Sequence, residues 1–204
     1  MSRKSGIVVA MSSERFQQVV RKIDEANAAD PHKVQTESGT QPYELAYSGW
    51  VTEWVRRLEP AASEELLVAA RGQHIRRWEI PRDSYPDDRK GYLQWREALK
   101  QFHAEKIGRI MREAGYPEES VERAARIILK KNLRDPESQA VEDALCLVFL
   151  ERQFSDLSRK EPEEKMVEIL RKTWRKMGEK GRAEALKLTL SGPEQALLKK
   201  ALTS

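Results

Sequence analysis

Apolar residues recur at steps of three and four along most of this chain, which is the spacing of one face of an α-helix. No convincing stretch alternates between apolar and polar residues at the period of two that a half-buried strand requires. The predicted fold class is therefore all-α. The pattern predicts helices that begin at residue 12 or 13 and run to 28, and then over residues 42–58, 63–78, 88–114, 117–132, 136–158, 162–177, 179–190 and 193–204.

Residues typical of helix beginnings support these predicted helices. Ser63 has the side chain preferred at an N-cap, and Asp135 followed by Pro136 has the sequence of an N-cap and first helical residue. Residues 30–41 and 79–87 are polar and contain Pro or Gly. Both segments are predicted to be loops.

Length and composition favour one compact unit. A chain of 204 residues with 39% hydrophobic content can bury one sizeable core. We expect residues 12–204 to form a single all-helical domain, with the more highly charged residues 161–204 packed on it as a C-terminal helical cap. Residues 1–11 are expected to be a loose tail, because helix punctuation begins only after them.

The compartment is predicted from what the sequence lacks. No apolar run approaches the roughly 20 residues of a membrane span, and the apolar patch at residues 7–10 is too short for a signal peptide. Cys146 is the only cysteine, so no intramolecular disulfide can form, and we expect it to be a small core residue. These features predict a cytoplasmic protein without a membrane partner.

Four predicted helices each carry one polar residue of a metal-ligand type on or beside the apolar face. These residues are Glu44, His74, His103 and Asp143. Burial of an ionised carboxylate is unfavourable by several kcal/mol unless a partner compensates the charge. We therefore expect the four groups to meet. They would either bind a divalent metal ion, such as Mn, Fe, Ni, Zn or Mg, or form hydrogen-bonded pairs in the core without a metal.

Catalytic roles are predicted for part of this group. Gln73 adjoins His74 and is placed to orient a ligand or a bound water molecule. The candidate catalytic residues are therefore Gln73, His74 and Asp143.

Basic residues concentrate around the same part of the chain. The net charge is +4, from 37 basic and 33 acidic residues, and this excess alone implies no polyanion partner. The candidate phosphate-binding residues are the arginines that gather between residues 71 and 96, namely Arg71, Arg76, Arg77, Arg82 and Arg96. Lys100 is predicted to turn away from the core, and the basic helix within residues 165–180 to present a solvated face rather than an RNA or membrane surface.

Common catalytic motifs are absent from the sequence. It contains no Gly-rich phosphate loop, no Cys-x-x-Cys pair, no His-Glu-x-x-His and no Gly-x-Ser-x-Gly. Nucleotide binding by the common loop motifs and serine hydrolase chemistry are therefore unsupported.

The order of several short blocks resembles the family catalogued as domain of unknown function 4202. The resemblance extends over nearly the whole chain from about residue 13, and the family name implies no activity. The blocks are Pro-Tyr-Glu-Leu at 42–45, Gln-His-Ile-Arg-Arg-Trp at 73–78, Ile-Pro-Arg at 80–82, Tyr-Pro at 85–86, Gly-Tyr at 91–92, Trp-Arg at 95–96, Glu-Asp at 142–143 and Val-Phe-Leu-Glu at 148–151.

A more distant resemblance concerns residues 69–75, Ala-Ala-Arg-Gly-Gln-His-Ile, which look like the Ala-Ala-x-x-His-Asp-Ile block of the all-helical HD-superfamily metal phosphohydrolases. It implies an HD-like bundle with additional C-terminal helices. Gln73 and His74 stand in the places of the metal-bridging His-Asp pair, which is a departure that alters the metal centre. His103 resembles a later histidine, Asp143 the terminal aspartate, and Glu44 stands where such proteins carry a first-helix histidine.

Two principal functions remain open at this stage. The HD resemblance implies metal-assisted hydrolysis of a phosphate ester, with a small phosphorylated or nucleotide ligand held by the arginines. The alternative is a non-catalytic helical module that binds a phosphorylated metabolite, RNA or a protein on a degenerate HD-like scaffold. A purely structural adaptor is a third hypothesis, and the sequence leaves homo-oligomer formation open.

Overall fold

The computed structural model describes residues 13–132 and 134–203, and the tail predicted for residues 1–11 lies outside this part. Helices dominate the described residues, so the predicted all-α fold class is confirmed. They are α1 (Glu14–Ala28), α2 (Tyr43–Leu58), α3 (Glu64–Gly72), α4 (Arg89–Glu113), α5 (Glu118–Leu129), α6 (Pro136–Val148), α7 (Phe154–Ser158), α8 (Glu163–Lys176), α9 (Glu179–Ala185) and α10 (Gly192–Thr203).

Side-chain caps fix the beginnings of four helices. In each, a side-chain oxygen accepts a hydrogen bond from the backbone N–H three residues further on, which satisfies a donor that has no partner within the helix. The capping residues are Ser13, Ser63, Asp88 and Asp135. The capping roles predicted for Ser63 and Asp135 are thus confirmed.

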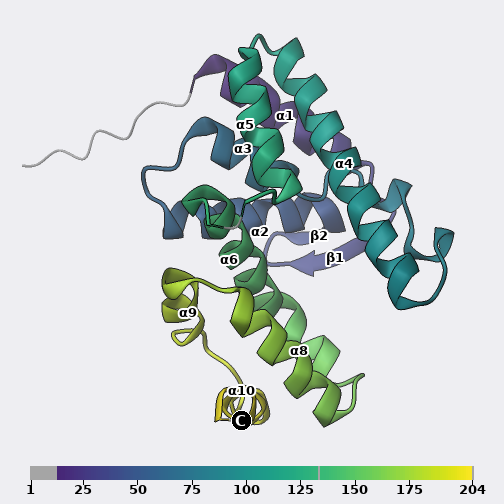
Figure 1. Cartoon of the computed structure of the whole chain (residues 1–204), viewed down its shortest axis with the longest axis vertical. Coiled ribbons are helices and arrows are strands. Elements are labelled where there is room, and N and C mark those ends of the chain that lie inside the picture. The colour runs from purple at the N-terminus through teal and green to yellow at the C-terminus, as the bar shows by residue number, and fades with distance from the viewer. Residues whose placement is uncertain (1–12, 133, 204) are drawn as a thin grey trace, which may run out of the picture.

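The helices form one continuous core. In Figure 1, α1, α3, α4 and α5 gather at one end of the molecule, α2 crosses its middle, and α8, α9 and α10 lie at the other end. Helix α4 packs on α5, α2 packs on α3 and α6, and α6 carries α9. A single apolar cluster connects these groups and includes Val51 of α2, Ile107 of α4, Leu147 of α6 and Leu170 of α8.

A short β-hairpin replaces part of the loop predicted for residues 30–41. Strands β1 (Lys33–Thr36) and β2 (Gly39–Pro42) pair antiparallel, with Val34 opposite Gln41. Gly39 has a φ of +100°, a conformation that favours glycine in the turn. The prediction missed the hairpin because neither strand has a buried residue and both carry almost no apolar residues to show a period of two.

Helix α3 ends six residues earlier than the predicted helix over residues 63–78. Gly72 ends it where α3 lies against α4, and a Cβ atom at Gly72 would come within 2.4 Å of Ile107 Cδ1. The chain then turns, and Arg76 takes a left-handed conformation with φ of 50°. His74 therefore lies in a turn rather than on a helix.

The rest of the chain follows the predicted helices with small differences. Helix α6 continues through a π-helical turn, Phe149–Gln153, into α7, so the helix predicted over residues 136–158 has one irregular turn. Helix α9 ends at Ala185 rather than at residue 190. Among the described residues, no helix has the length and apolar character needed to cross a membrane.

Candidate functional site

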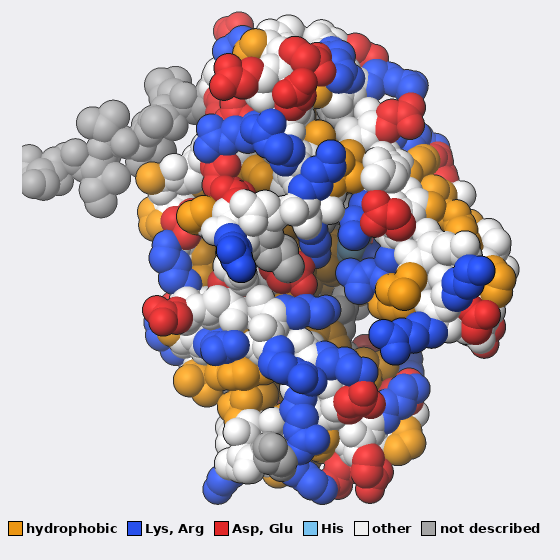
Figure 2. Space-filling view, viewed as in Figure 1, with side chains coloured by type: hydrophobic (Ala, Val, Ile, Leu, Met, Phe, Trp, Pro, Cys, Tyr) orange, Lys and Arg blue, Asp and Glu red, His pale blue; other side chains and the backbone are white. Residues whose placement is uncertain are grey.

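A cavity of about 270 Å³ opens between α4 on one side and α6 and α8 on the other. The turn after α3 and Tyr47 of α2 contribute further lining, and Lys130 at the end of α5 lies at its edge. Figure 2 shows this face of the molecule hollowed near its centre, with Lys and Arg side chains gathered around the hollow. The elements that line the cavity are thus far apart in the sequence.

Positive charge dominates the lining. Five cationic side chains come from α4, α5, α8 and the turn after α3, and they are Arg77, Arg96, Lys100, Lys130 and Lys176. Glu142 is the single carboxylate among the described residues that line the same cavity. Cations collected in a hollow with low-dielectric walls concentrate their field there, so the cavity attracts anions.

Two of these cations have no carboxylate partner among the residues that the structure describes. Arg77 donates a hydrogen bond from Nη1 to His74 Nε2 at 3.0 Å, and its guanidinium lies 4.9 Å from the centre of the Trp95 ring. Arg96 contacts the hydroxyl of Tyr92 at 3.4 Å. Both guanidinium groups therefore keep donors for a ligand, and carboxylates act on their charges only at longer range, Glu44 on Arg77 and Glu142 on Arg96.

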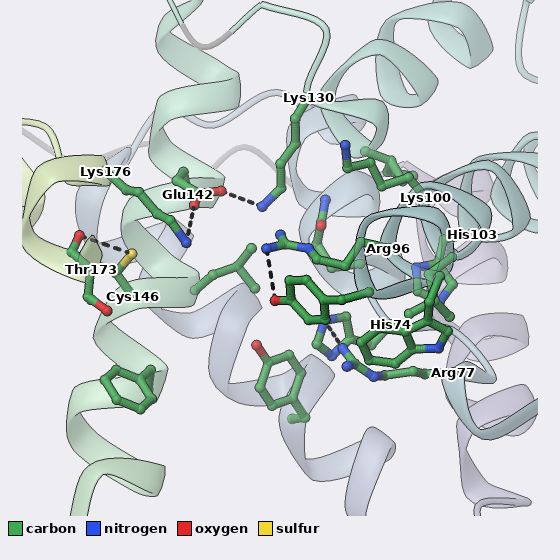
Figure 3. A pocket seen from close by; sticks show the side chains of 18 residues that line it. His74, Arg77, Arg96, Lys100, His103, Lys130, Glu142, Cys146, Thr173 and Lys176 are labelled. Carbon is green, nitrogen blue, oxygen red and sulfur yellow. Dashed lines mark hydrogen bonds and ion pairs between the residues drawn. The ribbon is translucent and has the colours of Figure 1, made fainter. Parts of the chain in front are cut away.

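On the side of the cavity formed by α6 and α8, the positive charge is neutralised in part. Glu142 of α6 forms an ion pair with Lys130, and its second oxygen lies 3.9 Å from Lys176 Nζ (Figure 3). Lys130 occupies the C-cap of α5 with φ of 53°, a conformation usually taken by glycine or asparagine. A lysine at this strained position brings an ammonium group to the cavity, and strain of this kind is common at functional sites.

His74 forms the floor of the cavity together with Tyr47. The two rings stack with centroids 4.4 Å apart, and His74 Nδ1 lies 3.4 Å from Glu44 Oε2. Because Arg77 can only donate to His74 Nε2, the neutral ring carries its proton on Nδ1, facing Glu44. Burial, aided by Arg77, lowers the pKa of His74 well below its usual value, and burial raises the pKa of Glu44 to about 8.

His103 is the second buried imidazole, and its ring centroid lies 6.0 Å from that of His74. It forms a hydrogen bond with the backbone of Gln73, and its Nε2 has no partner. Burial and the charge of nearby groups lower the pKa of His103 well below the usual value, so the ring is neutral near pH 7. Gln73 also lines the cavity, and its side-chain Nε2 is buried without a partner.

Asp143 does not join the two histidines. Its carboxylate accepts hydrogen bonds from the backbone N–H groups of Gly178 at 2.7 Å and Gly181 at 3.2 Å, and from the amide of Gln139 at 2.8 Å. The same Gln139 amide donates to the carbonyl of Lys176, the last residue of α8. Asp143 thus binds the start of α9 and supports the end of α8, which positions Lys176.

The four residues assigned to a metal ion from the sequence do not form one ligand set. The two histidines line the cavity and Glu44 lies behind His74, whereas the oxygens of Asp143 are engaged by α9 and Gln139. Within residues 13–132 and 134–203, no group of three or more His, Cys, Asp or Glu residues is arranged to hold a metal ion. The donor atoms therefore do not fit a divalent cation.

The five arginines assigned to phosphate binding divide into two groups. Arg77 and Arg96 line the cavity. Arg71 pairs with Asp24 at 2.7 Å, Arg76 pairs with Glu79, and Arg82 pairs with Asp87 at 3.5 Å, all outside the lining. Each of these three arginines thus forms an ion pair with a carboxylate outside the cavity.

Three lysines of the cavity were not predicted from the sequence. Lys100 was expected to turn away, yet it lies one turn from Arg96 on the same face of α4 and lines the cavity. A stripe at residues 92, 95, 96, 99, 100 and 103 was the available signal, because its steps of three and four mark one helix face. Lys130 and Lys176 stand at the ends of two other helices, and Lys176 belongs to the helix whose basic face was interpreted as solvated.

Comparison with known proteins places the chain in a family. Residues 17–198 match a family model described as a domain of unknown function, DUF4202. The chain belongs to this family. No curated protein and no solved structure matches it.

The range that matches DUF4202 includes the whole candidate site. All lining residues, from Tyr47 to Lys176, lie within the matched range of residues 17–198. The description of DUF4202 assigns no activity, so the cavity itself is the source of any functional inference.

Proposed function

We propose that the protein binds a small phosphorylated molecule in the cavity between α4, α6 and α8. The observation that carries this proposal is the pair Arg77 and Arg96, two cavity-lining guanidinium groups that form no ion pair with a carboxylate of the described residues. Guanidinium groups match phosphate oxygens geometrically and form charge-assisted hydrogen bonds with them. Lys100 and Lys130 add positive charge at the same cavity.

The size of the cavity supports a small ligand. Its volume of about 270 Å³ lies just below the usual range of small-molecule sites, which begins at about 300 Å³. An RNA strand or a protein surface would instead require an extended groove. Among the hypotheses from the sequence, binding of a phosphorylated metabolite therefore has the better support.

The geometry favours binding over metal-assisted hydrolysis. The HD resemblance points to the same class of ligand, a phosphate ester, but the residues that would hold its metal ion are divided between the cavity floor and the start of α9. The function we propose therefore requires the cations of the cavity and no metal ion.

Removal of one of these two guanidinium groups tests the proposal. In Arg96→Gln, we expect the affinity for inorganic pyrophosphate, measured by isothermal titration calorimetry in metal-free buffer, to fall about tenfold or more. A hydrogen bond to a charged group contributes about 1.5–3 kcal/mol, which corresponds to that range.

Arg109→Gln is the matched control. Arg109 lies on the same helix, but its side chain is exposed and pairs with Glu105 away from the cavity. Its loss should leave the affinity within a factor of about two. Equal affinities in the two variants, or no binding of pyrophosphate by the wild-type protein, would contradict the proposal.

A further inference from the structure

Two buried polar atoms of the cavity lining have neither a hydrogen-bond partner nor a facing carboxylate among the described residues. They are the side-chain Nε2 of Gln73 and the ring Nε2 of His103; a third such atom, His74 Nδ1, faces Glu44 Oε2 at 3.4 Å and is set aside for that reason. Gln73 is 5% exposed and His103 is 3% exposed, so bulk water reaches neither side chain freely. Burial of a polar group without a partner is unfavourable, so a ligand that enters the cavity gains by supplying partners to these two atoms.

The two atoms have opposite hydrogen-bonding roles. The backbone carbonyl of Gln73 can only accept, so its hydrogen bond with His103 requires a ring N–H donor. Because His103 Nε2 has no partner, Nδ1 is that donor and Nε2 carries a lone pair in the neutral ring. The side-chain Nε2 of Gln73 carries two N–H donors.

A hydroxyl group is the simplest ligand group that satisfies both atoms, because it accepts one hydrogen bond and donates another. A phosphate or carbonyl oxygen could accept from Gln73 but offers no hydrogen to His103. An ammonium group could donate to His103 but could not accept from Gln73, and it would also be repelled by the cations of the cavity.

We propose that Gln73 and His103 bind a hydroxyl group of the ligand, so that the ligand is a phosphorylated polyol or sugar. This inference rests on the proposed phosphate-binding function and specifies its ligand class. Figure 3 places His103 on one side of the view and Lys130, Glu142 and Lys176 on the other, with Arg96 between them. The hydroxyl end of the ligand lies at His103, and its phosphate lies at Arg96.

The test compares two phosphate esters that differ in their hydroxyl groups. Ribose 5-phosphate and n-pentyl phosphate each carry five carbons, but the second has no hydroxyl. We expect the wild-type protein to bind ribose 5-phosphate at least tenfold more tightly in calorimetric titrations, because a site built for a hydroxyl group rejects the analogue that lacks it.

Two variants assign this preference to the two side chains. Gln73→Met keeps the approximate size of the side chain and removes the donor, and His103→Phe removes the acceptor. Each should reduce the affinity ratio of the two esters to near one. Lys100→Gln is the control, because loss of a phosphate contact should weaken both esters equally and leave the ratio unchanged.

The outcomes separate this inference from the function on which it rests. A ratio near one in the wild-type protein, or a ratio unchanged in Gln73→Met, would overturn hydroxyl recognition. If pyrophosphate still binds, the proposed phosphate-binding function would stand. If pyrophosphate and both esters fail to bind, the proposed function and this inference fall together. Pyrophosphate affinity also reports whether each variant is folded, and Gln73→Met decides the matter if His103→Phe does not fold.

Discussion

Single residues of the cavity are held in charge states that follow from their burial. His74 and His103 are neutral near pH 7 because burial and neighbouring cations lower their pKa values. The positive charge of the lining therefore resides on its arginines and lysines, and only the two arginines lack an ion pair among the described residues. The imidazoles remain available as neutral hydrogen-bonding groups, which is the state that recognition of a hydroxyl group requires.

Glu44 gives a stability prediction at the same scale. Burial raises its pKa from about 4.5 to about 8, so between these values the folded chain holds a proton that the unfolded chain has released. The free energy of unfolding should therefore fall as pH rises through this window, by about 1 kcal/mol for each pH unit. Glu44→Gln removes this contribution, so the variant should gain stability relative to wild type between pH 6 and 8.5 in urea unfolding.

Glu97→Gln is the control for this measurement. Glu97 is exposed on α4, and hydrogen bonds from Gln101 and Lys100 keep its pKa below the ordinary value, outside the window. Its variant should follow the wild-type pH dependence. Parallel curves for wild type and Glu44→Gln would show that Glu44 does not hold a proton in the folded chain.

Residue spacing predicted part of the candidate site. It placed His74 and His103 toward the interior and named Gln73 as the neighbour of His74, and all three line the cavity. It could not distinguish their surroundings from those of Asp143, because helical phase shows that a side chain points inward but not which group meets it. The carboxylate of Asp143 meets the start of α9, a contact between segments 35 or more residues apart.

At the scale of elements, capping residues and apolar spacing predicted most helices, because each of these sequence signals lies in the helix or directly beside it. The N-caps Ser63 and Asp135 are examples. The early end of α3 had no such signal, because the pattern from Ala70 through His74 to Trp78 continues at helical spacing. The close approach of Gly72 to Ile107 and the left-handed turn that follows depend on tertiary packing, which the pattern does not contain.

The junction of α6 with α9 gives a prediction for one element. A Cβ atom at Gly181 would lie 2.5 Å from Asp143 Cγ, so the two helices meet only because residue 181 has no side chain. Gly181→Ala should lower the free energy of unfolding by about 1–3 kcal/mol in urea titrations, as overpacking of a buried contact does.

The matched substitution is Gly192→Ala, where a Cβ atom would meet nothing within 4 Å. This residue begins α10, and alanine has the higher helix propensity, so the variant should be as stable as wild type or slightly more stable. Equal losses of stability in the two variants would refute the proposed close packing of Gly181 on Asp143.

At the scale of the whole molecule, the cavity differs in charge compensation from a larger hollow that also carries arginines. The second hollow, about 660 Å³, is lined by Arg56, Arg71 and Arg152 together with the carboxylates Glu37 and Glu53, whereas the described lining of the cavity has five cations and one carboxylate. Arg71 and Arg152 pair with Asp24 and Glu151 respectively. The larger hollow thus offers an anion less uncompensated charge than the cavity at Arg77 and Arg96, although its volume is greater.

The central claim is that a phosphorylated ligand binds at Arg77 and Arg96. The most direct measurement is a titration of ¹⁵N-labelled protein with inorganic pyrophosphate in metal-free buffer, in which the arginine Nε–H signals are followed by NMR. We predict that the signals of Arg77 and Arg96 shift and saturate together, while those of Arg71 and Arg152 stay in place. Shifts confined to Arg71 and Arg152, or signals of Arg77 and Arg96 that do not move at millimolar pyrophosphate, would contradict the claim.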